Sequence, residues 1–282
     1  MNRKSAFLTT TMGVCLTAMV CCALWGSAFP CIKIGYQLFQ IDGNDISSQL
    51  LFAGCRFTLA GLLTILLGSL MNRRPLIPRK TSWIRIAKLS LFQTVIQYLF
   101  FYVGLAHTTG VKASIIEASN VFVAILIASL IFRQEKLDKH KIIGCIAGFA
   151  GVVLININQS GLDMSLSLTG EGFILLSTIA YAVSSVLIKI YSREDNPVML
   201  SGWQFLLGGI IMILCGYLTG GSVSVWTAPS ISMLFYLAAV SAVAYSLWGI
   251  LLKLNPVSKV AVFGFMNPVF GVILSALFLG EG

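Results

Sequence analysis

Charged residues are scarce in this chain. Only 10% of its 282 residues are Asp, Glu, Lys or Arg, whereas 57% are hydrophobic and the mean hydropathy is +0.90. A soluble domain carries about 25% charged residues. A chain with so few of them cannot cover a water-facing surface, so the composition predicts an integral membrane protein.

Histidine is rarer still, and the usual motifs of hydrolytic enzymes are missing. The two histidines, His107 and His140, are predicted on opposite sides of the membrane, so they cannot form one site. No His-Glu-x-x-His and no Gly-x-Ser-x-Gly motif occurs, which makes a membrane-embedded enzyme the weaker hypothesis. The seven cysteines lie in or beside apolar segments without metal-ligand spacing, and we interpret them as packing residues. We predict no metal and no cofactor.

The net charge of +9 does not indicate nucleic-acid binding. The basic residues form no stripe with interleaved aromatic residues, which such binding requires. They lie instead in short segments between apolar runs, where they orient a protein in its membrane. We therefore predict no nucleic-acid partner.

Nine apolar segments are long enough to be candidate membrane spans, since a span needs about 20 mostly apolar residues. The short basic start before the first of them resembles a signal peptide, but the many later spans favour a first membrane helix. The predicted spans are Thr10–Ile32, Leu50–Met71, Leu89–Ala106, Ala113–Phe132, Ile142–Ile157, Phe173–Ile190, Met199–Leu218, Ile231–Leu252 and Val260–Leu279.

The basic residues alternate between the connecting segments. Of the 19 Lys and Arg residues, 16 lie at the N-terminus or in the loops after the even-numbered spans, and the other loops hold only Lys112. Positive charge favours the cytoplasmic side. The pattern predicts a multi-pass protein of the plasma or inner membrane with a cytoplasmic N-terminus.

Two segments 148 residues apart resemble each other. Residues 54–70 and 202–218 align without a gap and agree at 8 of 17 positions. Leu and Ile matches mean little between apolar helices, whereas three glycines and a phenylalanine in one register indicate a duplication. The informative pairs are Gly54/Gly202, Phe57/Phe205, Gly61/Gly209 and Gly68/Gly216.

Five spans per half is an odd number, so the two halves have inverted topology. We predict an all-α fold of two five-helix halves, residues 1–158 and 159–282, with nine spans present. The tenth would follow Gly282; either it is absent from this chain or the protein is a natural nine-span one, and we favour the first. Inverted repeats are characteristic of secondary transporters with a site between the halves. A passive channel and a duplicated scaffold remain the alternatives.

Several short motifs resemble the EamA-type family of the drug/metabolite transporter superfamily. They occur in the family's order and spacing over nearly the whole chain, although the fourth span has Asn120 where the family often has proline. The resemblance implies ten helices around a central cavity and export of amino acids or related small metabolites, and it leaves proton exchange open. The motifs are Trp25–Pro30 with Lys33, Arg56-Phe57, Gly104–Gly110, Glu135–Leu137, Asn255-Pro256 and Asn267-Pro268.

Ionisable residues inside a bilayer usually face a cavity or a partner. Arg56 and Glu117 lie within predicted spans, and Lys33 lies near the end of one. We expect Arg56 or Lys33 to pair with Glu117 at the outer mouth of a cavity. Such a pair could simply lock two helices, or Glu117 could couple transport to a proton or cation. These three residues are our candidates for coupling or gating.

Polar and aromatic residues within the spans are the candidates for substrate binding. Gln93 and Gln97 are one helical turn apart and share a face. Apolar, aromatic walls with a few polar groups suit a small metabolite, although helix packing explains any single residue equally well. The set comprises Trp25, Gln93, Gln97, Tyr98, Asn120, Tyr181, Gln204, Tyr245, Trp248 and Asn267. Glycines 144, 148 and 151 form a flat face that packs within the subunit or in a homodimer.

Overall fold

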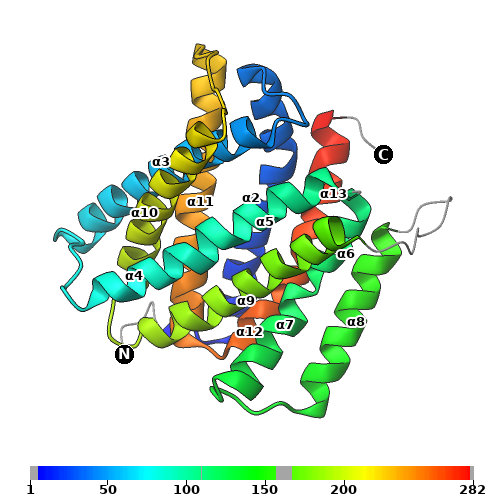
Figure 1. Cartoon of the computed structure of the whole chain (residues 1–282). Coiled ribbons are helices and arrows are strands. Elements are labelled where there is room, and N and C mark those ends of the chain that lie inside the picture. The colour runs from blue at the N-terminus through cyan, green and yellow to red at the C-terminus, as the bar shows by residue number, and fades with distance from the viewer. Residues whose placement is uncertain (1–5, 109, 157–166, 280–282) are drawn as a thin grey trace.

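The computed structural model describes residues 6–108, 110–156 and 167–279, and every regular element in those ranges is a helix. The bundle is drawn in Figure 1. Its helices are α2 (Thr11–Phe39), α3 (Ile46–Asn72), α4 (Ser82–Ser90), η1 (Leu91–Ile96), α5 (Gln97–Ala106), α6 (Gly110–Ala118), α7 (Asn120–Leu126), η2 (Ile127–Ile131), α8 (Lys139–Asn156), η3 (Leu168–Gly172), α9 (Phe173–Tyr191), α10 (Pro197–Leu218), α11 (Ala228–Leu254), α12 (Val257–Ala261), η4 (Val262–Phe265) and α13 (Met266–Leu279).

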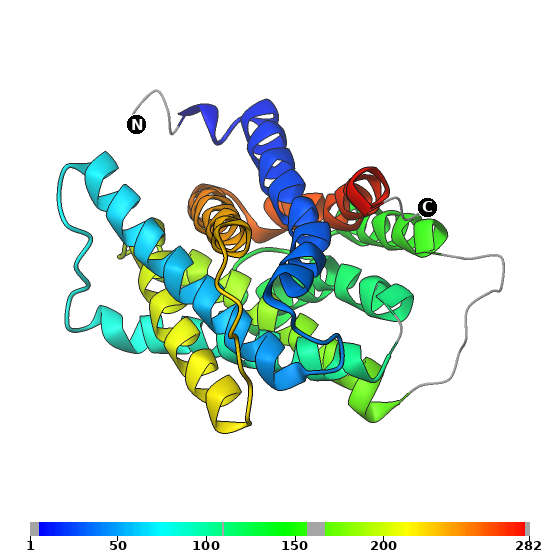
Figure 2. The same ribbon diagram turned by 90° about the horizontal axis from the view of Figure 1, so that it is seen from above.

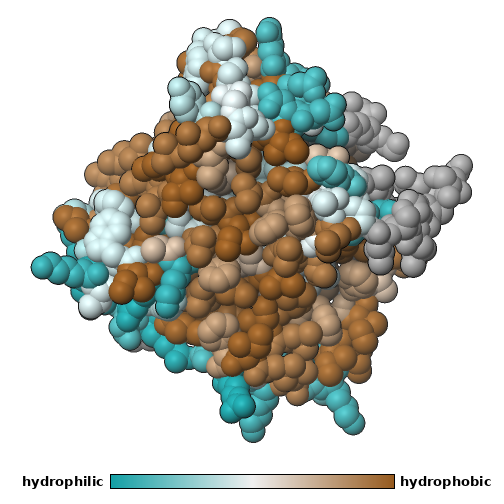
Figure 3. Space-filling view, viewed as in Figure 1, coloured by the Kyte–Doolittle hydropathy of each residue, from teal (hydrophilic) through white to brown (hydrophobic). Residues whose placement is uncertain are grey.

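Seven helical segments of the described chain are long and apolar enough to cross a membrane. They correspond to predicted spans one, two, three, six, seven, eight and nine. The first ends at Phe39 rather than at Ile32. The predicted span stops where the apolar run ends, before Lys33, but the helix continues for about two more turns. Hydrophobic side chains cover most of the face in Figure 3, and hydrophilic ones gather at its upper and lower ends. This pattern matches a bilayer-spanning bundle.

The predicted fourth and fifth spans do not meet the same criterion. The fourth consists of α6, α7 and the π-helix η2, with a turn at Ser119, and its apolar helix, Ile115–Ile131, is shorter than the seven spans. The fifth corresponds to α8, Lys139–Asn156, and its predicted last residue, Ile157, lies outside the described residues. The count of nine spans therefore stays a prediction.

Polar side chains at the helix starts define several boundaries. Asp45 accepts a hydrogen bond from the backbone of Ser48 and caps α3, while Asn196 caps α10 in the same way. Thr227 and Ser230 form a reciprocal capping box at α11. Each cap satisfies backbone N–H groups that a helix leaves without partners. Local sequence therefore determines where these three helices begin.

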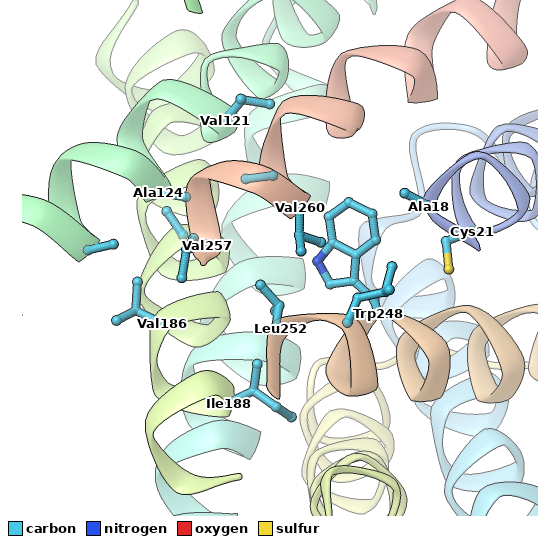
Figure 4. Packing of buried hydrophobic residues seen from close by; sticks show 14 of the residues in the cluster. Ala18, Cys21, Val121, Ala124, Val186, Ile188, Trp248, Leu252, Val257 and Val260 are labelled. Atoms are coloured by element: carbon cyan, nitrogen blue, oxygen red, sulfur yellow. The ribbon is translucent and has the colours of Figure 1, made fainter. Parts of the chain in front are cut away.

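Buried hydrophobic side chains from both predicted halves share one core. Figure 4 shows Trp248 of α11 beside Val260 of α12, with Ala18 and Cys21 of α2 close by. Trp248 is 5% exposed and the other three are fully buried. Helices α7 and α9 add further members to the same cluster. The halves are therefore intermixed rather than separate units.

Helices α3 and α10 are antiparallel and pack through their glycines; they lie side by side in Figures 1 and 2. A methyl group on Gly61 would lie 2.5 Å from the Leu206 nitrogen and 2.7 Å from the Gly202 oxygen. A methyl group on Gly209 would lie 2.4 Å from the Thr58 nitrogen and 2.9 Å from the Gly54 oxygen. No side chain fits at such distances, so only glycine permits this contact.

These contacts are reciprocal. Gly61 and Gly209 are 148 residues apart, and so are their contact partners Thr58 and Leu206. The same holds for a second pair: Gly54 packs against Ile213, and Gly202 packs against Ile65. Equivalent residues of the two repeated segments therefore make equivalent contacts across the α3–α10 interface.

One end of the bundle gathers the basic segments around Asp195, in the loop between α9 and α10. The side chain of Asp195 is 2% exposed and forms ion pairs with Arg79 (3.0 Å) and Arg85 (2.7 Å). Ser82 donates to the same carboxylate at 2.8 Å. Burial alone would raise the pKa of Asp195, but hydrogen bonds from Arg85, Ser82 and Arg79 outweigh it and hold this pKa below the ordinary aspartate value.

Further hydrogen bonds extend this basic end. Lys189 donates to the carbonyls of Leu252 and Asn255 at the end of α11. Lys259 donates to the carbonyl of Thr9, and Ser258 donates to Glu135. The segments after the second, fourth, sixth and eighth predicted spans thus meet one another and the start of α2 at one end of the molecule.

The glycine contact yields the first prediction. Gly61→Ala should lower the free energy of unfolding by about 1–3 kcal/mol, because the added methyl group overlaps the α10 backbone. Thermal unfolding in detergent micelles measures the change. Gly144→Ala is the control, since nothing lies within 4 Å of a methyl group there. A Gly61 variant as stable as the Gly144 variant would contradict this packing.

The Asp195 cluster yields a second prediction. Asp195→Asn should lower the free energy of unfolding by about 1.5–3 kcal/mol at neutral pH, because the hydrogen bonds of the arginines to a charged partner are lost. Since the pKa of Asp195 is lowered in the folded protein, its stabilisation is complete above the unfolded value of about 3.9 and is lost as the pH falls through the folded value.

The measurement is the thermal unfolding midpoint of both proteins at several pH values. The difference between them should stay constant from neutral pH to about pH 5 and should shrink only in more acidic solution. A difference that already shrinks between pH 8 and pH 6 would show that another group dominates.

Candidate functional site

Aromatic rings from four helices meet where α3 crosses α10. Phe57 of α3 stacks on Phe205 of α10, with ring centroids 5.2 Å apart and planes at 11°. The ring centroid of Tyr98 of α5 lies 4.5 Å from that of Phe57, and the ring centroid of Tyr245 of α11 lies 4.8 Å from that of Phe205. The hydroxyls of Tyr98 and Tyr245 are hydrogen-bonded at 3.2 Å. We call these four residues the aromatic centre.

Trp25 of α2 extends the aromatic centre. Its ring lies 4.9 Å from Tyr245 and 5.1 Å from Trp248, both edge to face. Such contacts are favourable for aromatic quadrupoles. The structure therefore brings together four of the predicted binding residues, namely Trp25, Tyr98, Tyr245 and Trp248.

Arg56 borders the aromatic centre and is almost completely buried, at 3% exposure. Its Nε and Nη2 atoms donate to the Ser241 hydroxyl of α11, at 3.2 Å and 2.9 Å. Its guanidinium carbon lies 5.2 Å from the centroid of the Phe57 ring, a cation–π distance. The predicted ion pair between Arg56 and Glu117 is absent among the described residues, and the guanidinium donates to Ser241 instead. The alternative pairing of Lys33 with Glu117 stays a prediction.

Glu117 is nonetheless near the same region. It is half-buried on α6, and α6 packs against α5 and α9, which carry Tyr98 and Tyr181. Lys33 is exposed on α2. Of the three residues predicted for coupling or gating, Arg56 lies beside the aromatic centre, and Glu117 lies on a helix that packs against α5.

Gln204 takes part in a hydrogen bond equivalent to the one between Arg56 and Ser241. Thr94 of η1 donates to the Gln204 side-chain oxygen at 2.8 Å, and Gln204 is fully buried. Arg56 and Gln204 are 148 residues apart, and Thr94 and Ser241 are 147 residues apart. One hydrogen bond joins α3 to α11 and its equivalent joins η1 to α10. Arg56 and Gln204 thus each share a hydrogen bond with a hydroxyl of another helix, but only Arg56 carries a charge.

Several buried polar atoms in the bundle have no hydrogen-bond partner among the described residues. Gln93 and Gln97, at 4% and 7% exposure, each leave the side-chain oxygen without a partner. Other such atoms are Trp25 Nε1, Gln204 Nε2 and Asn267 Oδ1. Buried polar groups are nearly always hydrogen-bonded. Five of the ten predicted binding residues therefore have capacity for a ligand or water.

The remaining predicted residues lie around the aromatic centre or farther along the bundle. Tyr181 of α9 packs against the same hydrophobic cluster. Asn120 begins α7 and lies near Gly264 of η4, and Asn267 belongs to α13; both are half-buried. Their role in binding stays a prediction.

Sequence reasoning missed Thr94 and Ser241, because single hydroxyl residues are common in apolar helices. A signal was present: at an offset of 147, Thr94 aligns with Ser241 and Tyr98 aligns with Tyr245. Phe205 was recognised only as a repeat marker, and Phe57 as a repeat marker and as part of the Arg56-Phe57 motif. Tyr102, at 5% exposure in the same cluster, carries no sequence signal of its own.

The face of glycines on α8 is used partly within the chain. A methyl group on Gly148 would lie 2.3 Å from the Phe265 ring of η4. Gly144 and Gly151 have nothing within 4 Å of that position. The contact of Gly148 is therefore intramolecular.

Comparison with known proteins gives concordant matches. The model of the EamA-like transporter family matches residues 12–157 and 168–282. Similar proteins include a WAT1-related chloroplastic protein of Arabidopsis thaliana, 25% identical over 99% of this chain and 68% of its own length. An uncharacterized transporter, YvbV, of Bacillus subtilis is 26% identical over 92% and 81%, and one of Archaeoglobus fulgidus is 30% identical over 92% and 86%.

A solved structure also resembles this fold. The match to that crystal structure has a TM-score of 0.77 and covers 95% of this chain and 90% of the other, at 16% identity. At that identity the likeness concerns the arrangement of the helices alone.

The two equivalent hydrogen bonds yield the third prediction. Ser241→Ala should lower the free energy of unfolding by about 1.5–3 kcal/mol, because it removes the acceptor of a buried guanidinium. Thr94→Val should cost only about 0.5–1.5 kcal/mol, because both partners of that bond are neutral. Thermal unfolding in detergent compares the two.

Ser232→Ala is the control on the same helix, since the exposed Ser232 hydroxyl bonds only to the Ala228 carbonyl one turn away. It should change the stability by no more than a few tenths of a kcal/mol. If Thr94→Val proved as costly as Ser241→Ala, the charge of Arg56 would not distinguish the two positions.

Proposed function

The chain belongs to the EamA-like transporter family of the drug/metabolite transporter superfamily, and on that premise we propose that it is a secondary transporter of small metabolites such as amino acids. It works by alternating access across the plasma or inner membrane, in the direction of export. The observation that carries this proposal is the pair of equivalent hydrogen bonds, Arg56–Ser241 and Thr94–Gln204.

The reciprocal contacts support an inverted repeat of two halves, residues 1–158 and 159–282. Equivalent glycines of α3 and α10 contact equivalent partners, and the family matches the chain in two segments that begin and end near this division. Two related halves in opposite orientations have two arrangements of similar energy, one open to each side. That property is what alternating access requires.

The packing at the aromatic centre supports a closed intermediate arrangement. Phe57 and Phe205 are fully buried, and Arg56, Gln204 and Tyr245 are at most 5% exposed. Because α3 and α10 are antiparallel, Arg56 precedes Phe57 toward one end of the bundle and Gln204 precedes Phe205 toward the other. Opening to one side separates one of the two hydrogen bonds, and opening to the other side separates its counterpart.

The basic end of the molecule supports the proposed orientation. The interlinked segments around Asp195 carry Arg79, Arg85 and Lys253, and positive loops favour the cytoplasm. The N-terminus is then cytoplasmic. Glycines 144 and 151 of α8 leave a surface on which two copies could pair within the bilayer.

Glu117 is the proposed coupling group, with Arg56 and Lys33 as residues of the gate. A carboxylate within a span is costly in the bilayer unless it has a function or a partner. Because α6 packs against α5, which carries Tyr98, protonation of Glu117 is proposed to bias the packing of the aromatic centre. The coupled ion is then a proton.

Transport by purified protein in liposomes tests the function. We expect at least one amino acid from a radiolabelled set to show saturable counterflow, and a pH gradient to accelerate it. In Glu117→Gln the acceleration should fall at least about tenfold, a loss of ~1.4 kcal/mol of coupling, because the amide cannot bind or release a proton.

Glu194→Gln is the matched control, because Glu194 is an exposed carboxylate at the basic end, paired with Arg85. It should retain the response to the gradient. Flux that rises linearly without saturation would identify a channel, and flux equal to that of empty liposomes would leave a membrane scaffold. Glu117→Gln with an unchanged response would remove Glu117 from the coupling mechanism.

A further inference from the structure

Arg56 is a buried charge without an acidic partner among the residues that the structure describes. Its hydrogen bonds go to one neutral acceptor, the Ser241 hydroxyl, although a guanidinium has five N–H donors. At 3% exposure it also has little access to water. A buried charge is ordinarily paired with an opposite charge. The described residues provide no such negative charge for Arg56.

The surroundings of Arg56 are rich in hydroxyl donors. The Phe57 ring covers one face of the guanidinium, with its centroid 5.2 Å from the guanidinium carbon. The Tyr98 ring centroid lies 4.5 Å from that of Phe57, and the Tyr98 hydroxyl of α5 is hydrogen-bonded to the Tyr245 hydroxyl of α11. An anion beside Arg56 would therefore lie close to the positive guanidinium, to neutral hydroxyl groups and to the apolar faces of aromatic rings.

The equivalent position shows that the charge is not required by the packing. Gln204 occupies the position of Arg56 in the other half, is fully buried, and bonds to the corresponding hydroxyl of Thr94. A neutral side chain thus makes the same contact between helices. The positive charge at Arg56 is additional to that structural role, so it is available for a ligand.

We propose that Arg56, together with the Ser241 hydroxyl, binds the carboxylate of the transported molecule, and that Phe57, Tyr98 and Tyr245 contact its apolar part. The ligand class is a small monocarboxylate with an apolar or aromatic body. One guanidinium balances one negative charge, and its planar fork matches a carboxylate. This inference rests on the proposed function and adds to it the group that the site recognises.

The chemistry of the site links this binding to opening. Arg56 of α3 and Ser241 of α11 belong to different halves, so their hydrogen bond breaks when the halves separate on that side. The carboxylate then takes the place of the Ser241 oxygen as acceptor, and the guanidinium is never left buried without one. Binding and separation thereby favour each other.

Equilibrium binding to purified full-length chain in detergent tests the proposal. The probes are benzoate, phenylacetate and hexanoate, each compared with its amide, which has nearly the same shape without the charge. Tryptophan fluorescence reports binding, because Trp25 lies 4.9 Å from Tyr245. We expect at least one carboxylate to bind about 10–100-fold more tightly than its amide.

In Arg56→Gln this preference should disappear, with the carboxylate binding as weakly as the amide. The matched variant is the exchange Arg56→Gln with Gln204→Arg, which moves the guanidinium to the equivalent position and should restore the preference. Ser232→Ala, at an exposed position of α11 away from the site, keeps Arg56 and should keep the preference too. Thermal unfolding identifies which variants are folded.

Two results would overturn the proposal: wild-type protein that prefers no carboxylate over its amide, or folded Arg56→Gln that keeps the wild-type preference. The first needs no variant, so a misfolded substitution does not block the test. Failure of the proposed function is a separate outcome. Protein that binds carboxylates through Arg56 but shows no flux in liposomes retains this site and loses transport, whereas saturable transport of the amides retains transport and loses this site.

Discussion

The close approach of α3 to α10 is the contact on which the rest of the structure depends. Glycines 54, 61, 202 and 209 let the two backbones touch, and the membrane offers no hydrophobic force between helices that could replace such packing. Because the approach is so close, Phe57 and Phe205 stack directly on each other. The tyrosines and the two hydrogen bonds of the aromatic centre are placed around that stack.

Polarity at the centre of an apolar bundle is the second constraint. In each predicted half, one polar side chain, Arg56 or Gln204, is hydrogen-bonded to a hydroxyl group of the other half, Ser241 or Thr94. Hydrogen bonds in such surroundings are costly to leave unmade. In the proposed transport cycle they hold the halves together in the closed arrangement, and a ligand or water replaces each of them when the halves separate. Because only Arg56 carries a charge, the two proposed open arrangements differ chemically.

Much of the site was within reach of the sequence. Trp25, Tyr98, Tyr245 and Trp248 were selected as aromatic residues within spans, and the structure brings them together. The partner of Arg56 was not predictable, because Ser241 lies 185 residues away and the charge of Glu117 made it the obvious but wrong choice. Ser119 likewise divides the fourth predicted span, since hydropathy records apolar length and not the continuity of a helix.

The sequence by itself determined the membrane class, the alternation of basic loops and the duplicated segment, because composition, charge and repeated glycines are properties of the chain that need no coordinates. Only the tertiary structure decided which copies of the repeat touch, and that Arg56 and Gln204 occupy equivalent positions with different charge. The reason is physical. Helical periodicity states which residues share a face, whereas the partner of a face depends on how closely two backbones can approach.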